Sequence, residues 1–291
     1  MVSSIWKTMR PNNWLKNVFV LAPLFISGSI ANPESAGRTA LVFVAFCLMS
    51  SAVYFLNDIL DRDRDKIHPE KRNRPIAAGL IRIPVAIAIA TVLCGTALVL
   101  SILTTPLVTG VLVSYALINI AYSLKLKHVV IADVFCIAIG FVLRVAAGAF
   151  AIGVQPTAWI IVATFLLSLF LALAKRRNEL LMLGDDSTGH RPILDAYTPQ
   201  FVDELISVVT PLTLITYLLY TLDPETTQRM NTDYLYTTGI FVVFGIFRYL
   251  YLIHRKNLGG SPTDIVVKDG PMIFAIIGWV TVLSIVIYLS G

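Results

Sequence analysis

Three aspartates spaced three and four residues apart, Asp58, Asp61 and Asp65, are the side chains of this sequence best suited to metal chemistry. Asn57 precedes them, where an apolar run at about residues 39–57 meets a polar segment. If the helix continues past that run, about 100° per residue puts the three carboxylates within about 60° of one another. Such carboxylates repel unless a cation lies beside them, and Mg²⁺ takes one or two carboxylates, water and substrate phosphate oxygens. The spacing therefore predicts a Mg²⁺–diphosphate site.

A cluster of basic residues follows the aspartates in a segment that prolines and a glycine interrupt, so we expect a loop there. Its cations are Lys71, Arg72 and Arg74. Ammonium and guanidinium groups bind the phosphate oxygens that a metal leaves unbound. A plainer interpretation stays open, in which the aspartates form a solvated helix end and pair with their basic neighbours Arg62, Arg64 and Lys66.

Apolar runs are the elements that must position these side chains. The chain has 291 residues, of which 56% are hydrophobic and 14% charged, and this composition is typical of a membrane protein. Runs of roughly 17–22 residues recur, each long enough to cross a hydrocarbon layer of about 30 Å as a helix. We predict nine spans, at about 14–31, 39–57, 84–103, 105–121, 129–152, 157–174, 202–221, 234–253 and 271–289. The predicted fold is an all-α polytopic membrane protein with one integral-membrane domain, residues 1–291.

Lysine and arginine are concentrated on one side of this topology. The N-terminus and alternate loops hold 19 of the 23 basic residues. The positive-inside rule makes that side cytoplasmic and puts the aspartates there too, so we predict a multi-pass protein of the cell (inner) membrane with a cytoplasmic active site. A localised basic surface suits anionic ligands at a membrane, and we expect no nucleic-acid partner.

Further charged residues lie at or inside the predicted spans. Lys175, Arg176 and Arg177 follow the sixth span, where they fit phosphate binding or an ordinary basic helix end, and Glu179 is placed to pair with Lys175. Intramembrane charges usually face a polar cavity or one another. We expect Asp133 to be close enough to the cytoplasmic end to belong to the site, and Arg144, which lies deeper, to be structural or at the floor of a cavity.

The pattern Asn57-Asp58-x-x-Asp61-x-x-x-Asp65 at the end of the second span resembles the first aspartate-rich motif of the UbiA superfamily of intramembrane transferases. This resemblance implies a bundle of nine helices with a polar cavity on the cytoplasmic side. In typical aromatic prenyltransferases of the superfamily, a second motif, Asp-x-x-x-Asp, follows the sixth span. Here that position reads Lys175-Arg176-Arg177-Asn178-Glu179, which favours direct phosphate binding over a second metal cluster.

With Arg10-Pro11-x-x-Trp14-x-Lys16-Asn17 near the start, the sequence is similar to the decaprenyl-phosphate phosphoribosyltransferase branch. The resemblance implies Mg²⁺-dependent transfer of 5-phosphoribose from phosphoribosyl diphosphate to a polyprenyl phosphate lipid, which supplies arabinose donors for the cell wall. It implies that Asn57, Asp58, Asp61 and Asp65 hold the metal. The implied phosphate and cavity residues are Lys71, Arg72, Arg74, Lys175, Arg176 and Arg177, with Lys16, Arg191, Tyr122 and Lys125 as further candidates.

Two other functions stay open at this stage. Prenyl transfer from a polyprenyl diphosphate to an aromatic acceptor such as 4-hydroxybenzoate uses the same first motif. An ion-coupled transporter could use Asp133, Arg144 and the acidic face, although the clustering of charges at one membrane face disfavours a midplane transport site. The uniform apolar surface also leaves room for a homo-oligomer.

Overall fold

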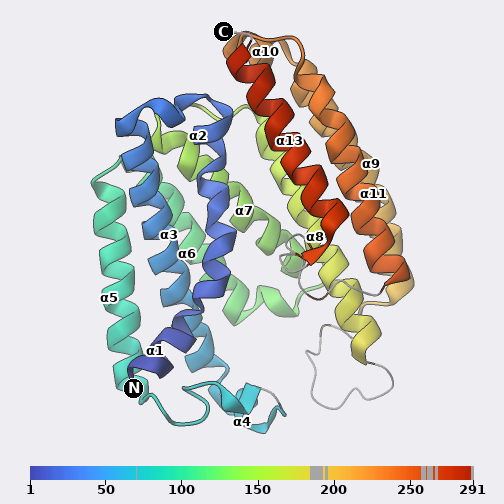
Figure 1. Ribbon diagram of the computed structural model, residues 1–291. Helices are drawn as coiled ribbons and strands as arrows, with labels where there is room; N and C mark the ends of the chain where they lie inside the picture. The colour runs from blue at the N-terminus through green and yellow to red at the C-terminus, as the bar shows by residue number, and fades with distance from the viewer. Residues whose placement is uncertain are drawn as a thin grey trace. The chain divides into compact units, whose positions relative to one another are not determined.

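The computed structural model describes residues 1–69, 71–183, 193, 196–256, 260, 265 and 268–289 (Figure 1). Every regular element in these residues is helical, and eight helices are long and apolar enough to cross a membrane. The chain divides into two compact units, Met1–Lys127 with Gly140–Pro156, and His128–Ile139 with Thr157–Gly291. The predicted all-α membrane fold is confirmed, whereas the prediction of one domain over residues 1–291 stays a prediction.

The first unit combines long helices with short helical segments that precede or link them. In chain order its elements are α1 (Val2–Met9), η1 (Pro11–Val20), α2 (Ala22–Ile26), η2 (Ser29–Ala31), α3 (Pro33–Leu60), α4 (Arg62–Ile67), η3 (Lys71–Asn73), α5 (Ile83–Ile102), α6 (Pro106–Leu124) and the later part of α7 (Ala132–Ala151), while η4 (Leu126–His128) lies where the first unit gives way to the second.

Helix α3 is the core element of this unit and ends in the aspartate segment. Its apolar window is 61% buried, against 17% for α5, which lies beside it (Figure 1). Phe46 and Met49 on α3 join a buried cluster with Leu112 of α6 and Ala147 of α7. The packing of α3 on several neighbours fixes the place and direction of its last turn, where the acidic residues begin.

Proline and a capping side chain together set where several of these helices start. Asn32 accepts hydrogen bonds from the backbone N–H groups of Glu34 and Ser35 at the start of α3, directly before Pro33. Thr105 accepts one from Val108 at the start of α6, directly before Pro106. The oxygen satisfies an N–H group that has no partner within the helix, and proline has no N–H to satisfy. This pairing explains why short polar connections separate such long apolar helices.

The first predicted span, residues 14–31, is not one continuous helix. The 3₁₀ segment η1 leads into the five-residue helix α2 and then η2. Pro23 cannot supply a backbone N–H, and Gly28 has a left-handed backbone with φ 67°. Because a 3₁₀ helix rises about 2.0 Å per residue, ten residues of η1 extend over roughly 20 Å. The other eight predicted spans each correspond to one of the long helices.

The second unit is formed by the earlier part of α7 and the helices that follow. They are α8 (Ala158–Leu183), α9 (Pro199–Leu222), α10 (Pro224–Met230), η6 (Leu235–Thr238), α11 (Gly239–Arg255) and α13 (Gly270–Leu289). Phe170 and Leu173 of α8 pack with Ile206 of α9 and Ile253 of α11 in one buried cluster. Helix α8 continues past the span predicted at 157–174, so Lys175, Arg176 and Arg177 are on its last turns.

Candidate active site

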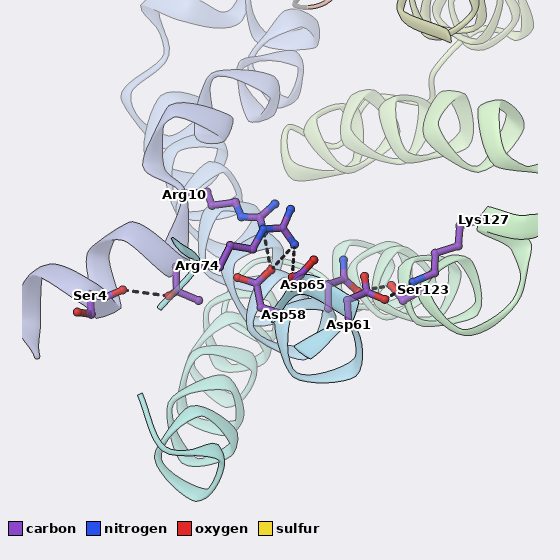
Figure 2. Close-up of polar contacts among 10 residues, drawn as sticks. Ser4, Arg10, Asp58, Asp61, Asp65, Arg74, Ser123 and Lys127 are labelled. Atoms are coloured by element: carbon purple, nitrogen blue, oxygen red, sulfur yellow. Dashed lines mark hydrogen bonds and ion pairs between the residues drawn. The ribbon is translucent and has the colours of Figure 1, made fainter. Parts of the chain in front are cut away.

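Two of the three aspartates bind a pair of arginines from outside α3 and α4 (Figure 2). Asp58 Oδ1 lies 2.5 Å from Arg10 Nη2 and 3.3 Å from Arg74 Nη1, and Asp65 Oδ2 lies 2.7 Å from the same Arg74 nitrogen. The two aspartates are 2% and 4% exposed. Buried carboxylates are stable only when they are paired and hydrogen-bonded, so these arginines account for two acids in a buried position.

The third aspartate has a different cation. Asp61 Oδ1 accepts a hydrogen bond from Lys127 Nζ at 2.7 Å, and the neighbouring Asn57 side chain accepts one from the Ser123 hydroxyl. Asp61 separates α3 from α4, although the i→i−4 bonds on both sides of it remain. The structure thus places Asp58 and Asp65 around Arg74 and pairs Asp61 with Lys127. That all three carboxylates share one face stays a prediction.

The arginines are held in place by local structure. Arg10 ends α1 with a left-handed backbone, φ 54°, and its guanidinium lies 4.8 Å from the centre of the Tyr54 ring. Ser51 of α3 donates to the Met9 carbonyl at 3.1 Å and so ties the end of α1 to α3. Arg74 precedes Pro75 and Ile76, and Ile76 is 1% exposed in a small apolar cluster with Phe55.

The donor set has the chemistry of a Mg²⁺ site, because carboxylate oxygens are the hard ligands this ion prefers. No group of three histidine, cysteine, aspartate or glutamate side chains converges on one metal position within the part of the chain that the structure describes. Two carboxylates do converge, since Asp58 and Asp65 each direct an oxygen at one nitrogen of Arg74. Two carboxylate oxygens that face one cation could also hold a divalent ion, so Asp58 and Asp65 fit a Mg²⁺ whose other ligands come from the substrate and water.

The other predicted residues of the first unit differ in exposure. Lys16, Lys71 and Tyr122 are partly buried, and Arg72 and Lys125 are exposed. Of the two lysines that follow Tyr122, the structure brings Lys127 to the aspartates and leaves Lys125 in solvent.

In the second unit, Arg176 lies in a buried ionic cluster. Its side chain is 4% exposed, Nη2 lies 2.5 Å from Asp133 Oδ2, and Nη1 pairs with Glu179. The Tyr197 hydroxyl donates to Asp133 Oδ1 at 2.8 Å and accepts from the Ile131 N–H at 2.7 Å. Burial, with the adjacent Asp133 carboxylate adding to it, raises the pKa of Tyr197 to about 12. This cluster ties the start of α7 and the end of α8 to Tyr197, two residues before α9 begins.

The other residues of this unit that were predicted to bind phosphate are Lys175, Arg177 and Arg191. Lys175 is half exposed and lies 3.8 Å from Glu179. Arg177 lies 2.6 Å from Asp203 and donates to the Ile253 carbonyl. Arg191, also predicted to bind phosphate, lies outside the described residues.

Arg10 and Lys127 are site residues that sequence reasoning did not assign. Arg10 lies 48 positions before Asp58, and Lys127 lies 66 positions after Asp61. Spacing along the chain carries no signal of such contacts. The sequence carried one signal for Arg10, which begins the pattern Arg10-Pro11-x-x-Trp14-x-Lys16-Asn17. It offered no reason to prefer Lys127 over Lys125.

Comparisons with known proteins agree on family and fold. The UbiA prenyltransferase family model matches residues 18–262. A protein from Mycolicibacterium smegmatis named decaprenyl-phosphate phosphoribosyltransferase is 30% identical to this chain, and the match covers 100% of this chain and 94% of that protein. A protein of that name from Corynebacterium glutamicum is 29% identical over 97% of this chain and 86% of its own length. A UbiA homologue from Archaeoglobus fulgidus, solved bound to DMAPP and Mg²⁺, has a TM-score of 0.74 at 17% identity, covering 98% of this chain and 99% of that one.

Proposed function

The chain belongs to the UbiA prenyltransferase family of membrane transferases, and from that premise we propose that it transfers 5-phosphoribose from phosphoribosyl diphosphate to a polyprenyl phosphate. The similarity of the whole chain to bacterial proteins named decaprenyl-phosphate phosphoribosyltransferase is the observation that carries this choice of reaction. A lipid of decaprenyl phosphate type is the acceptor, and diphosphate is the other product. The product would serve the synthesis of arabinose donors for the cell wall.

The aspartate segment is the proposed diphosphate end of the site. Asp58 and Asp65 would hold Mg²⁺, with Asp61 and Asn57 completing the set around it. The metal, when bound, supplies positive charge that stabilises the diphosphate as a leaving group. Arg10, Arg74 and Lys127, which pair with the aspartates, are also proposed to bind phosphate oxygens of the donor.

Other basic residues are proposed to bind the remaining phosphates of donor and acceptor. The donor carries a 5-phosphate as well as its 1-diphosphate, so it needs cations at two places. The proposed phosphate ligands are Lys71, Arg72, Lys175, Arg176 and Arg177, with Lys16 and Arg191 as further candidates, and Tyr122 and Lys125 are proposed to line the cavity. Arg176 and Arg177 pair with acids of their own unit, so phosphate binding there requires either a shared contact or an exchange of partners.

The bond changes need little acid–base chemistry. An oxygen of the acceptor phosphate attacks C1 of the ribose, the bond from C1 to the diphosphate oxygen breaks, and its electron pair leaves with the diphosphate. Because the acceptor phosphate is already an anion at pH 7, no strong base has to remove a proton. The residues that hold the two substrates in line supply much of the rate, and the configuration at C1 inverts.

A two-substrate assay tests the proposal. Purified protein in lipid is given labelled phosphoribosyl diphosphate with decaprenyl phosphate, or labelled prenyl diphosphate with 4-hydroxybenzoate. We expect a labelled lipid from the first pair only, and only with Mg²⁺ present. A prenylated aromatic product from the second pair alone would replace the proposed reaction with aromatic prenyl transfer.

A further inference from the structure

Arg74 occupies the position between the two buried aspartates. Its Nη1 atom lies 2.7 Å from Asp65 Oδ2 and 3.3 Å from Asp58 Oδ1 (Figure 2). Mg²⁺ binds oxygens at about 2.0–2.1 Å, so an ion bridging these two oxygens would need the space of that nitrogen. The guanidinium and a bridging metal therefore exclude one another.

Charge balance decides when that exchange is favourable. Asp58 and Asp65 face Arg10 and Arg74, and Asp61 faces Lys127, so each carboxylate of the motif has a cation. Free Mg²⁺ that displaced Arg74 would add two positive charges and separate a guanidinium from both of its acids. Taking one partner from a buried ion pair is costly unless another replaces it. A diphosphate supplies that replacement, because its oxygens bind the metal and can also accept both N–H groups of a guanidinium edge.

The side chain of Arg74 is placed to make this change. The Arg74 side chain is 29% exposed, while the side chains of Asp58 and Asp65 are 2% and 5% exposed. The partly exposed guanidinium therefore contacts two buried carboxylates. The backbone after it is fixed by Ile76, which is 1% exposed in the apolar cluster with Phe55. Movement of the long side chain alone, on a fixed backbone, can shift the guanidinium from carboxylate to phosphate.

We propose that Arg74 makes the site select a metal–diphosphate complex over either component alone. Mg²⁺ takes the place between Asp58 and Asp65, the guanidinium moves onto the diphosphate, and each ligand thereby raises the affinity for the other. Thermodynamic linkage makes this coupling reciprocal. The inference rests on the proposed function and adds the residue that determines which form of the ligand binds.

Calorimetric binding to the purified full chain in nanodiscs tests the exchange. The three titrants are Mg²⁺ alone, pyrophosphate alone in a chelator, and the preformed Mg²⁺–pyrophosphate complex. In the wild type we expect weak binding of Mg²⁺ and tighter binding of the complex. In Arg74→Gln the competing cation and the phosphate ligand are both lost, so Mg²⁺ alone should bind roughly fivefold or more tightly than in wild type, while the complex binds more weakly.

Lys66→Gln is the matched control, because it removes the same charge from a residue paired instead with the exposed Asp63. It should leave both affinities within about twofold of wild type. Opposite shifts for the two titrants in Arg74→Gln cannot come from a general loss of structure.

Three results overturn the inference. The first is that Arg74→Gln binds Mg²⁺ alone no more tightly than the wild type does. The second is that Lys66→Gln shows the same tighter binding of Mg²⁺ and weaker binding of the complex. If Arg74→Gln does not fold, Arg74→Lys keeps the charge but not the two-pronged phosphate contact, so it should weaken binding of the complex alone. Wild-type affinities for both titrants in Arg74→Lys would then be the contrary result. A wild type that binds neither Mg²⁺ nor the complex would instead remove the proposed function itself.

Discussion

Lys127 reaches Asp61 from 66 positions further along the chain, and its side chain is only 11% exposed. A partly buried cation beside a phosphate site contributes roughly 1.5–3 kcal/mol through charged hydrogen bonds. We expect Lys127→Met to lower kcat/KM for phosphoribosyl diphosphate by roughly ten- to a hundredfold, since each 1.36 kcal/mol is a factor of ten. Lys125→Met, two positions earlier on an exposed side chain, should have a smaller effect.

Steady-state kinetics on both purified variants makes this comparison. A larger loss in Lys125→Met than in Lys127→Met would return the assignment to the residue that the sequence pattern favoured. It would also mean that the Lys127–Asp61 contact has no part in donor binding.

Among the described residues of the second unit, Arg176 and Asp133 form the most deeply buried ion pair, at 4% and 0% side-chain exposure. Removing one partner of a buried pair costs about 3–5 kcal/mol, because the other charge stays buried. Arg176→Met should therefore lower the midpoint of thermal unfolding in detergent well below that of Arg38→Met, whose exposed pair with Glu34 is worth about 0–1 kcal/mol.

The double variant Arg176→Met with Asp133→Leu should recover much of that loss, since no buried charge is then left unpaired and the more exposed Glu179 keeps Lys175. Equal midpoints for Arg176→Met and Arg38→Met would show that the buried pair does not hold the second unit together.

Arg144, in the first unit, is a contrasting case. Its guanidinium donates to Asn17 at 2.8 Å and Tyr115 at 3.0 Å, which are neutral partners, so its loss would strand no carboxylate.

At the level of helices, the length of the apolar runs and the residues at their ends made most of the fold predictable. The eight long helices were predicted because each apolar run is long enough to cross a bilayer as a helix. Several helices start where a proline follows a capping residue. The broken first segment was harder to predict, since Pro23 announces an interruption but not the 3₁₀ form of η1. The ion pair between Asp61 and Lys127 could not be predicted, because helical spacing within one segment gives no information about contacts with another segment.

Gly148 shows how closely η1 packs on α7. A Cβ atom at this position would collide with the Val20 carbonyl oxygen, which belongs to the backbone and cannot turn aside. Forcing atoms into a packed site costs about 1–3 kcal/mol, so Gly148→Ala should lower the unfolding midpoint in detergent. Gly95→Ala is the control: it meets nothing within 4 Å in the middle of α5, and replacing glycine in a helix adds roughly 0.5–1 kcal/mol of stability. A Gly148→Ala midpoint at or above that of Gly95→Ala would contradict the close packing.

At the scale of the whole molecule, the chain is a multi-pass membrane protein, and the distribution of basic residues predicts which face is cytoplasmic. Single cysteines at Asp63 and Glu34, exposed residues near opposite ends of α3, test this in a background without Cys47, Cys94 and Cys136. An impermeant maleimide should label Asp63→Cys only in inside-out vesicles and Glu34→Cys only in intact cells. The reverse pattern would place the aspartate segment outside the cytoplasm, away from a soluble phosphoribosyl donor.

The central proposal is a metal-bound diphosphate at the end of α3. Anomalous scattering from Mn²⁺, used in place of Mg²⁺ in a crystal grown with pyrophosphate, locates the ion directly. We predict a peak within coordination distance of the Asp58 and Asp65 carboxylates, with Arg74 bound to the diphosphate instead of to the acids. A peak elsewhere, with both aspartates still bound to Arg10 and Arg74, would contradict the account.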